Sequence, residues 1–322
     1  MVQILDFERE IFSLETQIHD LVSLSNMYDS VGDITDEITK LKKKLRRMKH
    51  DVYSNLKGWD KTLVARHPDR PHMLDYIENI FTDFYELHGD RHGGNGPAIV
   101  AGLAKFGDLS MMVIGHQKGR EVEEKIARNF GMSQPSGYRK ALRLMRMAEK
   151  FSMPIITFID TPGAYPGVDA EEKGQSEAIA TNMFSMIQMR VPIICVVIGE
   201  GGSGGALAIG VGDRVLMLEH SVYSVISPEG CASILWEDKN KTGQAADALC
   251  LTAKHLLKFE VIDQIVREPL GGAHRNHNQA AIRLKKALRK NVTELIEINP
   301  GELIRLREEK FRKMGEVIET KV

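Results

Sequence analysis

The sequence predicts an α/β fold with parallel pairing of its core strands. Apolar runs at 155–159, 193–198 and 214–218 have the length of strands that are buried on both faces. Stretches with helical spacing of apolar residues separate these runs, and helices commonly connect parallel strands. A loop that contains several glycines follows each of the first two runs. Together these observations place the chain among α/β proteins with loops at the ends of their strands.

The composition indicates an ordinary globular chain. Its 322 residues are 43% hydrophobic and 27% charged, with a formal net charge of −1, so no overall field attracts nucleic acid or a membrane. The longest apolar runs are far shorter than the ~20 residues that cross a bilayer, and the first residues lack the basic start of a signal peptide. We therefore expect a cytoplasmic enzyme or enzyme subunit with no membrane partner.

The cysteines and histidines predict no metal on this chain. Cys195, Cys231 and Cys250 show no CxxC spacing, which argues against a zinc ribbon and favours a reducing compartment. His88 and His92 have i,i+4 spacing, but no cluster of further ligands follows them.

Residues 1–58 predict a helical arm made of two antiparallel helices. The second helix has apolar residues at alternating spacings of four and three, as in a heptad repeat, at Ile34, Ile38, Leu41, Leu45, Met48 and Val52. The arm either binds a partner or folds as a hairpin on its own domain. The basic run over 40–47 is interpreted as a solvated face.

Residues 59–276 predict the α/β core, and 277–322 a C-terminal helical segment. A Pro- and Gly-rich stretch is followed by an amphipathic helix over 73–87. Strands are then expected over 98–104 and 109–115, joined by a tight turn, and over 154–160, 192–198, 214–218 and 222–226. Helices are expected around 141–148, over 176–189 and directly after the glycine loop near residue 204.

Two loops, at 160–167 and 199–205, carry the functional prediction. Each directly follows a buried strand, and the ends of neighbouring parallel strands deliver their loops to the same edge of the sheet. Glycine lets the backbone approach a ligand closely, and free N–H groups at a helix start stabilise negative charge. We therefore expect backbone donors on two sides of one pocket.

Other chemistry is less well supported by these residues. Gly199, Gly201 and Gly204 satisfy GxGxxG, but the helix that follows is short for a dinucleotide-binding unit and no hydride-handling site is evident. Residues 160–163 fit the DxxG motif of GTPases, but the chain has no GxxxxGK[ST] segment, which that class also needs. No GxSxG elbow is present, and Ser203 has no assigned base. The chemistry that these residues still support is stabilisation of an oxyanion by backbone N–H groups, which suits enolate reactions of thioesters.

Several unbroken blocks of the sequence then identify a family. They are HPDRP at 67–71, GHQKGR at 115–120, NFGM at 129–132, GYRKA at 137–141, and longer blocks at 154–167, 174–178, 199–212, 227–236 and 269–275. In these blocks, which span about residues 60–276, the chain resembles the carboxyltransferase alpha subunits of multi-subunit acetyl-CoA carboxylases. The helical arm also fits the N-terminal extension of that family.

The resemblance implies a crotonase-like fold (a ββα superhelix) and an α2β2 enzyme. In the family, a zinc-ribbon beta subunit of the same fold pairs with alpha and mainly holds the CoA thioester. Alpha mainly receives carboxybiotin, which is bound covalently to the biotin carboxyl carrier protein. The carboxyl group passes to acetyl-CoA and gives malonyl-CoA for fatty-acid synthesis. Biotin carboxylase belongs to the wider complex.

The expected site residues follow from the two loops and the resemblance. The Gly204–Gly205 peptide and the Gly163–Ala164 peptide are expected to donate N–H groups to the biotin ureido oxygen. The residues expected to bind substrate are Lys118 or Arg120 against the carboxylate, Tyr165 at the biotin pocket, and Gly201 and Gly202 in the glycine loop. Alternatives are a carboxyltransferase for another acyl-CoA, a different crotonase-like lyase, or a non-catalytic scaffold that docks the carrier protein.

Overall fold

The structure is a computed structural model that describes residues 4–27 and 32–315. Within these residues an eight-stranded mixed sheet has the order β1-β2-β3-β4-β5-β6-β8, and β7 pairs with the end of β5. Strands β1, β2 and β3 are antiparallel, and the pairs from β3 onward are parallel. The strands are β1 Thr82–Glu86, β2 Ile99–Phe106, β3 Leu109–His116, β4 Ile155–Thr161, β5 Ile193–Gly202, β6 Arg214–Leu218, β7 Val222–Ser224 and β8 Gln264–Val266.

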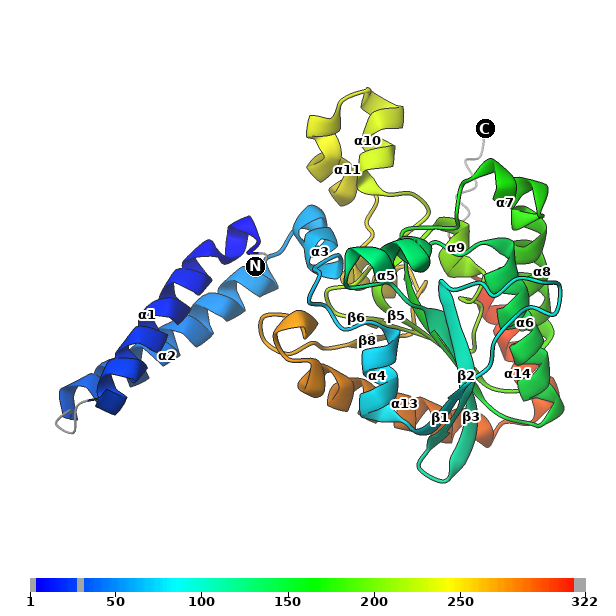
Figure 1. Cartoon of the computed structure of the whole chain (residues 1–322), viewed down its shortest axis with the longest axis horizontal. Helices are drawn as coiled ribbons and strands as arrows, with labels where there is room; N and C mark the ends of the chain where they lie inside the picture. The colour runs from blue at the N-terminus through cyan, green and yellow to red at the C-terminus, as the bar shows by residue number, and fades with distance from the viewer. Residues whose placement is uncertain (1–3, 28–31, 316–322) are drawn as a thin grey trace, which may run out of the picture.

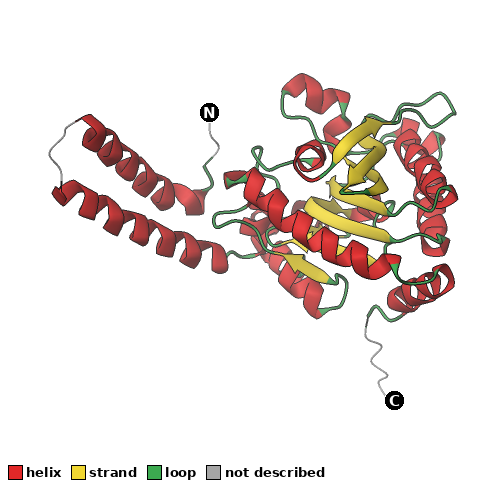
Figure 2. Ribbon diagram, turned by 90° about the horizontal axis from the view of Figure 1, so that it is seen from below, coloured by secondary structure: helices red, strands yellow, loops and turns green. Residues whose placement is uncertain are grey.

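Helices lie on both sides of this sheet (Figures 1 and 2). In chain order the α-helices are α1 Arg9–Met27, α2 Gly32–Ser54, α3 Gly58–Ala65, α4 Met73–Ile80, α5 Val122–Ala127, α6 Pro135–Lys150, α7 Val168–Glu172, α8 Gln175–Gln188, α9 Ser203–Leu207, α10 Pro228–Trp236, α11 Thr242–Ala248, α12 Ala253–Lys258, α13 His277–Ile296 and α14 Pro300–Arg312. Short 3₁₀ turns occur at Asp6–Glu8, Asn129–Gly131, Lys239–Lys241 and Ala273–Arg275. The predicted α/β fold is confirmed.

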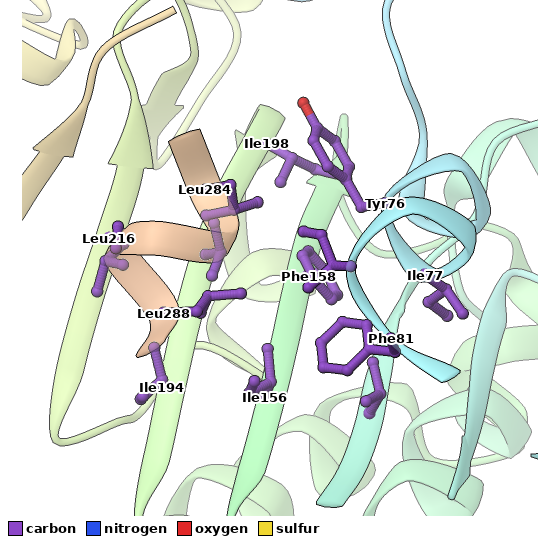
Figure 3. Close-up of a cluster of buried hydrophobic side chains, with 14 of the residues drawn as sticks. Tyr76, Ile77, Phe81, Ile156, Phe158, Ile194, Ile198, Leu216, Leu284 and Leu288 are labelled. Atoms are coloured by element: carbon purple, nitrogen blue, oxygen red, sulfur yellow. The ribbon is translucent and has the colours of Figure 1, made fainter. Parts of the chain in front are cut away.

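Alternation along β4 explains why the sheet has two apolar faces. Successive strand residues point to opposite faces. Ile156 and Phe158 therefore pack with α4 and α13 on one face, as Figure 3 shows. Ile155 and Ile159 pack with α6 and α8 on the other. All residues of β4 are buried, so the continuous apolar run in the sequence corresponds to a central strand.

The sequence prediction of a helix over 73–87 is wrong in its second half. The helix α4 ends at Ile80, Phe81 is extended, and 82–86 form β1 instead. Strand β1 pairs antiparallel with β2 and contains an irregularity at Asp83, which has a φ of 52°. The aromatic residues Phe84 and Tyr85 favour a strand, and helical spacing alone did not reveal that β2 offers an edge to pair with.

The helices α1 and α2 form an antiparallel hairpin that extends away from the sheet (Figure 1). At its base, the Tyr53 hydroxyl donates a hydrogen bond of 2.6 Å to Glu8, and Arg275 donates one of 2.8 Å to the same carboxylate oxygen. Lys49 and Glu15 pair across the two helices. The basic residues of 40–47 are exposed, as predicted for a solvated face.

The expected division into 1–58, 59–276 and 277–322 stays a prediction. Residues 1–3, 28–31 and 316–322, which belong to the arm and to the C-terminal segment, lie outside the described residues. The charged helices expected after residue 277 are α13 and α14. In the part of the chain that the structure describes, no helix combines the length and the apolar character that a membrane crossing requires.

Candidate active site

The two loops meet at the carboxyl edge of the sheet. Strands β4 and β5 are parallel neighbours, and Thr161 pairs with Gly201. A Cβ atom at Gly202 would overlap the Pro162 carbonyl group, and one at Gly205 would lie 2.5 Å from the Ala164 nitrogen. Only glycine permits this close approach of two backbones. The loop after β4 and the start of α9 therefore share one surface made of main-chain atoms.

The hydrogen bonds within the first loop indicate which of its N–H groups could bind a ligand. The Gly163 N–H donates to Thr161 Oγ1 at 3.1 Å, and the Tyr165 N–H donates to the Ser133 carbonyl at 3.1 Å. Between them, the Ala164 N–H is the group that this loop can offer to a ligand. In the second loop, the first N–H groups of α9, Gly204 and Gly205 included, precede any intrahelical acceptor. Ser203 opens that helix with a φ of 51°, a strained conformation often found at functional sites.

An apolar cavity of about 280 Å³ lies beside Gly204. Its walls include Leu207, Tyr223, Leu256 and Val261. The ring of Tyr223 packs against Gly201, where a Cβ atom would approach it to 2.8 Å. Main-chain donors at the edge of an apolar cavity interact more strongly with a developing anion than they would in water.

Asp160 connects the two loops. Its Oδ1 atom accepts a hydrogen bond of 2.6 Å from the Lys118 ammonium and one of 3.0 Å from the Glu200 N–H. Burial alone would raise the pKa of Asp160, but Lys118 and the other donors outweigh it and hold the pKa below its usual range. The carboxylate is therefore ionised and fixes the start of the glycine loop relative to β4.

Arg66 holds the glycine loop from the other side. Its guanidinium group contacts Glu200, at 2.6 Å, and also Glu229 of α10. Burial lowers the pKa of Arg66, and the two carboxylates raise it by more. Bidentate contacts of this kind fix geometry as well as charge, so Glu200 serves to orient the loop.

The predicted basic residues separate in the structure. Lys118 lines a second cavity, of about 260 Å³, together with Arg66, His72, Lys125 and Asp160. Arg120 instead pairs with Asp75 of α4 and donates a hydrogen bond of 3.3 Å to the Pro68 carbonyl group. Lys118 is therefore close to the two loops through Asp160, whereas Arg120 is tied to α4.

The other predicted site residues have mixed positions. Gly201 and Gly202 are buried in the end of β5, where they pair with Tyr223 and Ser224 of β7. The Tyr165 ring folds against Gly167, and Tyr165 lines neither of the two cavities just described. The structure thus brings the glycines and Ala164 together and leaves the Tyr165 ring to one side.

Sequence reasoning missed two residues at this edge of the sheet. Asp160 belongs to the first of the two predicted loops, but sequence reasoning gives it no role of its own, although an acidic residue at the end of a buried strand is itself a signal. His116, at the end of β3, is fully buried beside the loops. Its position depends on contacts between distant segments, which the sequence pattern does not show.

One group of potential metal ligands occurs among the described residues, at Glu8, His67 and His274. Glu8 already accepts hydrogen bonds from Tyr53 and Arg275. The rings of His67 and His274 stack with their centroids 4.2 Å apart, and a His274 ring nitrogen lies 3.6 Å from the same Glu8 oxygen. This arrangement fits a hydrogen-bonded anchor for the arm better than a metal centre.

Comparison with known proteins decides the family. The family model described as "Acetyl co-enzyme A carboxylase carboxyltransferase-like" matches residues 4–315. The acetyl-coenzyme A carboxylase carboxyl transferase subunit alpha of Geobacter metallireducens is 57% identical over 98% of both chains. The subunit of the same name from Methylococcus capsulatus is 54% identical and covers 98% of this chain and 97% of its own. The chain belongs to this family.

Solved structures confirm the crotonase-like carboxyltransferase fold of the family. The transcarboxylase 12S structure matches 77% of this chain and 43% of that chain, with a TM-score of 0.54 and 17% identity. A Pseudomonas malonate decarboxylase hetero-tetramer, in complex with coenzyme A, matches 69% of this chain and 90% of that chain, with a TM-score of 0.55 and 15% identity. At these identities the likeness concerns the fold alone. The resemblance found in the sequence blocks is confirmed.

Proposed function

We propose that this chain, as the alpha subunit of an acetyl-CoA carboxylase carboxyltransferase, supplies the site where carboxybiotin gives up its carboxyl group to acetyl-CoA. The observation that carries the proposal is the backbone contact between the two loops, which places the amides of Ala164 and Gly205 at one surface. The apolar cavity beside Gly204 has room for an uncharged ring. The residues present therefore fit the biotin group.

Main-chain hydrogen bonds are the chemistry that these residues provide. Carboxybiotin, when bound, supplies the carboxyl group and develops negative charge on its ureido oxygen as that group leaves. The Gly205 and Ala164 N–H groups would stabilise this charge, each by ~3–4 kcal/mol in the transition state. The proposal needs no side-chain base from this chain, because the biotin group, when bound, would itself supply the base for the proton that acetyl-CoA loses. This agrees with the lack of an evident nucleophile in the sequence.

Lys118 is the better placed of the two basic residues for pairing with the transferred carboxylate. It lines a cavity next to the loops, whereas Arg120 is held by Asp75. Lys118 now shares its charge with the buried Asp160 carboxylate. A second carboxylate would accept a charge-assisted hydrogen bond from the same ammonium group, which has three donors.

The partners follow from the family and are part of the proposal. We infer a zinc-ribbon beta subunit in an α2β2 assembly, acetyl-CoA bound mainly by beta, and carboxybiotin delivered by the biotin carboxyl carrier protein, with biotin carboxylase in the wider complex. The designation "subunit alpha" of the relatives supports the presence of other subunits. The three cysteines, all free, support a cytoplasmic location.

The test is the substitution Gly205→Val in the complex reconstituted with the beta subunit. The new side chain would meet the Ala164 nitrogen and the Gly163 carbonyl carbon, each 2.5 Å from its Cβ atom, and malonyl-CoA formation should fall by about 10²-fold or more. Gly243→Val is the matched control, because nothing lies within 4 Å of a Cβ atom there. Assembly of both variants is checked by size-exclusion chromatography. Near-normal activity of assembled Gly205→Val would refute the oxyanion assignment and favour the scaffold alternative.

Substrate choice is tested on the same preparation. Rates with acetyl-, propionyl- and butyryl-CoA, compared as kcat/KM, should rank acetyl-CoA first. A preference for a longer acyl chain would assign the complex to a different acyl-CoA carboxylase.

A further inference from the structure

His116 lies at the junction between β3 and the two loops. Its side chain is fully buried, and neither ring nitrogen has a hydrogen-bond partner in the described part of the chain. The preceding residue, Gly115, pairs with Phe158 of β4. Buried polar groups nearly always have partners, so one that lacks them calls for an explanation.

The backbones of Phe158 and Gly205 lie close enough to this imidazole ring to raise its pKa, as hydrogen-bond acceptors do. Burial is the largest influence on the ring and lowers the pKa of His116 to about 4, against the opposing effects of Asp160 and these backbone groups. The ring is therefore neutral at neutral pH, with one N–H donor. The contacts to the two backbone groups are looser than standard hydrogen bonds, because no partner meets the usual geometry.

The hydrogen bonds of α9 explain why Gly205 needs such a donor. After this single turn, the Ala208 N–H donates to the Gly204 carbonyl at 3.0 Å, and the Ile209 N–H donates to the Ala206 carbonyl at 3.4 Å. Neither of these two bonds has the Gly205 carbonyl group as its acceptor. A buried carbonyl group that is left out of the backbone pattern is normally satisfied by a side chain or by water.

We propose that His116 is a positioning residue for carboxyl transfer, whose imidazole N–H engages the Gly205 carbonyl group and thereby fixes the direction of the Gly205 N–H. This inference rests on the proposed function, in which that N–H binds the ureido oxygen. The two groups belong to peptide units on either side of one glycine, where backbone rotation is least restricted. A hydrogen bond that anchors the peptide unit after Gly205 therefore limits rotation of the peptide unit before it. Hydrogen bonds in catalytic sites often become short and well aligned only when substrate is bound.

The experiment compares donor and non-donor side chains in the complex reconstituted with the beta subunit. His116→Asn and His116→Gln keep an N–H donor, whereas His116→Phe keeps the size of the ring and removes the donor. We expect His116→Phe to lower kcat by about 10²-fold, the effect of a small misplacement in a catalytic site. The KM for carboxybiotin should change little, and at least one donor variant should recover most of the lost kcat.

The control is Tyr76→Phe, which also removes an unpartnered buried polar atom near Phe158 but lies in α4, on the other face of the sheet from α9. It should keep the kcat of the wild type. Thermal unfolding of each variant separates loss of fold from loss of positioning. A His116→Phe complex with normal kcat would overturn the inference, as would an equal loss of kcat in all three His116 variants.

The comparison with Gly205→Val distinguishes the two proposals. If Gly205→Val is inactive and His116→Phe is fully active, the oxyanion assignment stands and the positioning role of His116 is wrong. If Gly205→Val is active, the oxyanion assignment itself fails, and the role proposed for His116 fails with it.

Discussion

The carboxylate of Asp160 joins the Lys118 ammonium, at 2.6 Å, to the backbone of the glycine loop through the Glu200 N–H, at 3.0 Å. One oxygen atom thus accepts from Lys118, which follows β3, on one side and from Glu200 of β5 on the other. Because a Cβ atom at Gly199 would overlap this carboxylate, the loop can approach Asp160 only with glycine at position 199. The acid and the loop therefore form one unit.

Asp160→Asn should destabilise the fold and reduce carboxyl transfer. It leaves the partly buried Lys118 without its counter-ion, and breaking a buried ion pair costs about 3–5 kcal/mol. Urea unfolding measures the change in the free energy of unfolding. Asp169→Asn is the control, because its partner Lys173 lies 3.8 Å away at an exposed site and such pairs contribute less than about 1 kcal/mol. Equal stability of the two variants would contradict this account of Asp160.

Two substitutions within the glycine loop should have unequal effects. Gly202→Ala forces a Cβ atom onto the Pro162 carbonyl group, whereas at Gly204 the new atom meets only Ile179, at 3.6 Å. We expect Gly202→Ala to separate the loops and lower kcat by about 10²-fold, and Gly204→Ala to cause a much smaller loss. Steady-state rates of the reconstituted complex give the comparison. The reverse order would show that contact between the loops is not required.

The ion pair of Arg70 and Glu268 should make stability fall in acid. Burial alone would raise the pKa of Glu268, but Arg70 and neighbouring donors lower it to about 2. A carboxyl group with a depressed pKa in the folded state stabilises the protein above its unfolded pKa of about 4.3. That stability is lost as pH falls from there toward about 2.

In the Glu268→Gln variant, the free energy of unfolding should therefore fall less steeply as the pH is lowered than it does in the wild type. It should also lower stability at neutral pH, where the wild-type pair is intact. Glu294→Gln, at a half-exposed site paired loosely with Lys290, should leave the pH profile unchanged. If the Glu268 and Glu294 variants give the same acid limb, the pair is not responsible.

Glu8→Ala should loosen the base of the helical hairpin. The carboxylate of Glu8 is the shared acceptor for Tyr53 and Arg275, and its loss leaves the Tyr53 hydroxyl without this acceptor and Arg275 paired with Glu15 alone. We expect faster proteolytic cleavage near residues 55–58, with local opening easier by about 3 kcal/mol. Arg9→Ala, which breaks only an exposed pair with Asp6, should not change the cleavage rate. Unchanged cleavage of Glu8→Ala would show that other contacts hold the hairpin.

The sequence predicted the central strands and loops because their signals are local. The residues of β4 are all buried, so an uninterrupted apolar run was enough to find that strand, and parallel pairing then required its loop to meet the next one. Strand β1 was missed because it forms only by pairing with β2. The burial of His116 beside the loops, and the contact of Glu8 with Arg275, depend on segments far apart in the sequence, and no local pattern encodes them.

The contact between Gly202 and Pro162 also limits how such an enzyme can diverge. Substitutions cannot alter the chemistry of an edge built from peptide groups, since every residue type except proline carries the same amide N–H. New substrate preferences would have to arise in the walls, at positions such as Tyr223, Leu256 and Val261, while the reactive edge is inherited intact. Distant members of such a lineage would then share a reaction type long after their ligands had ceased to resemble one another.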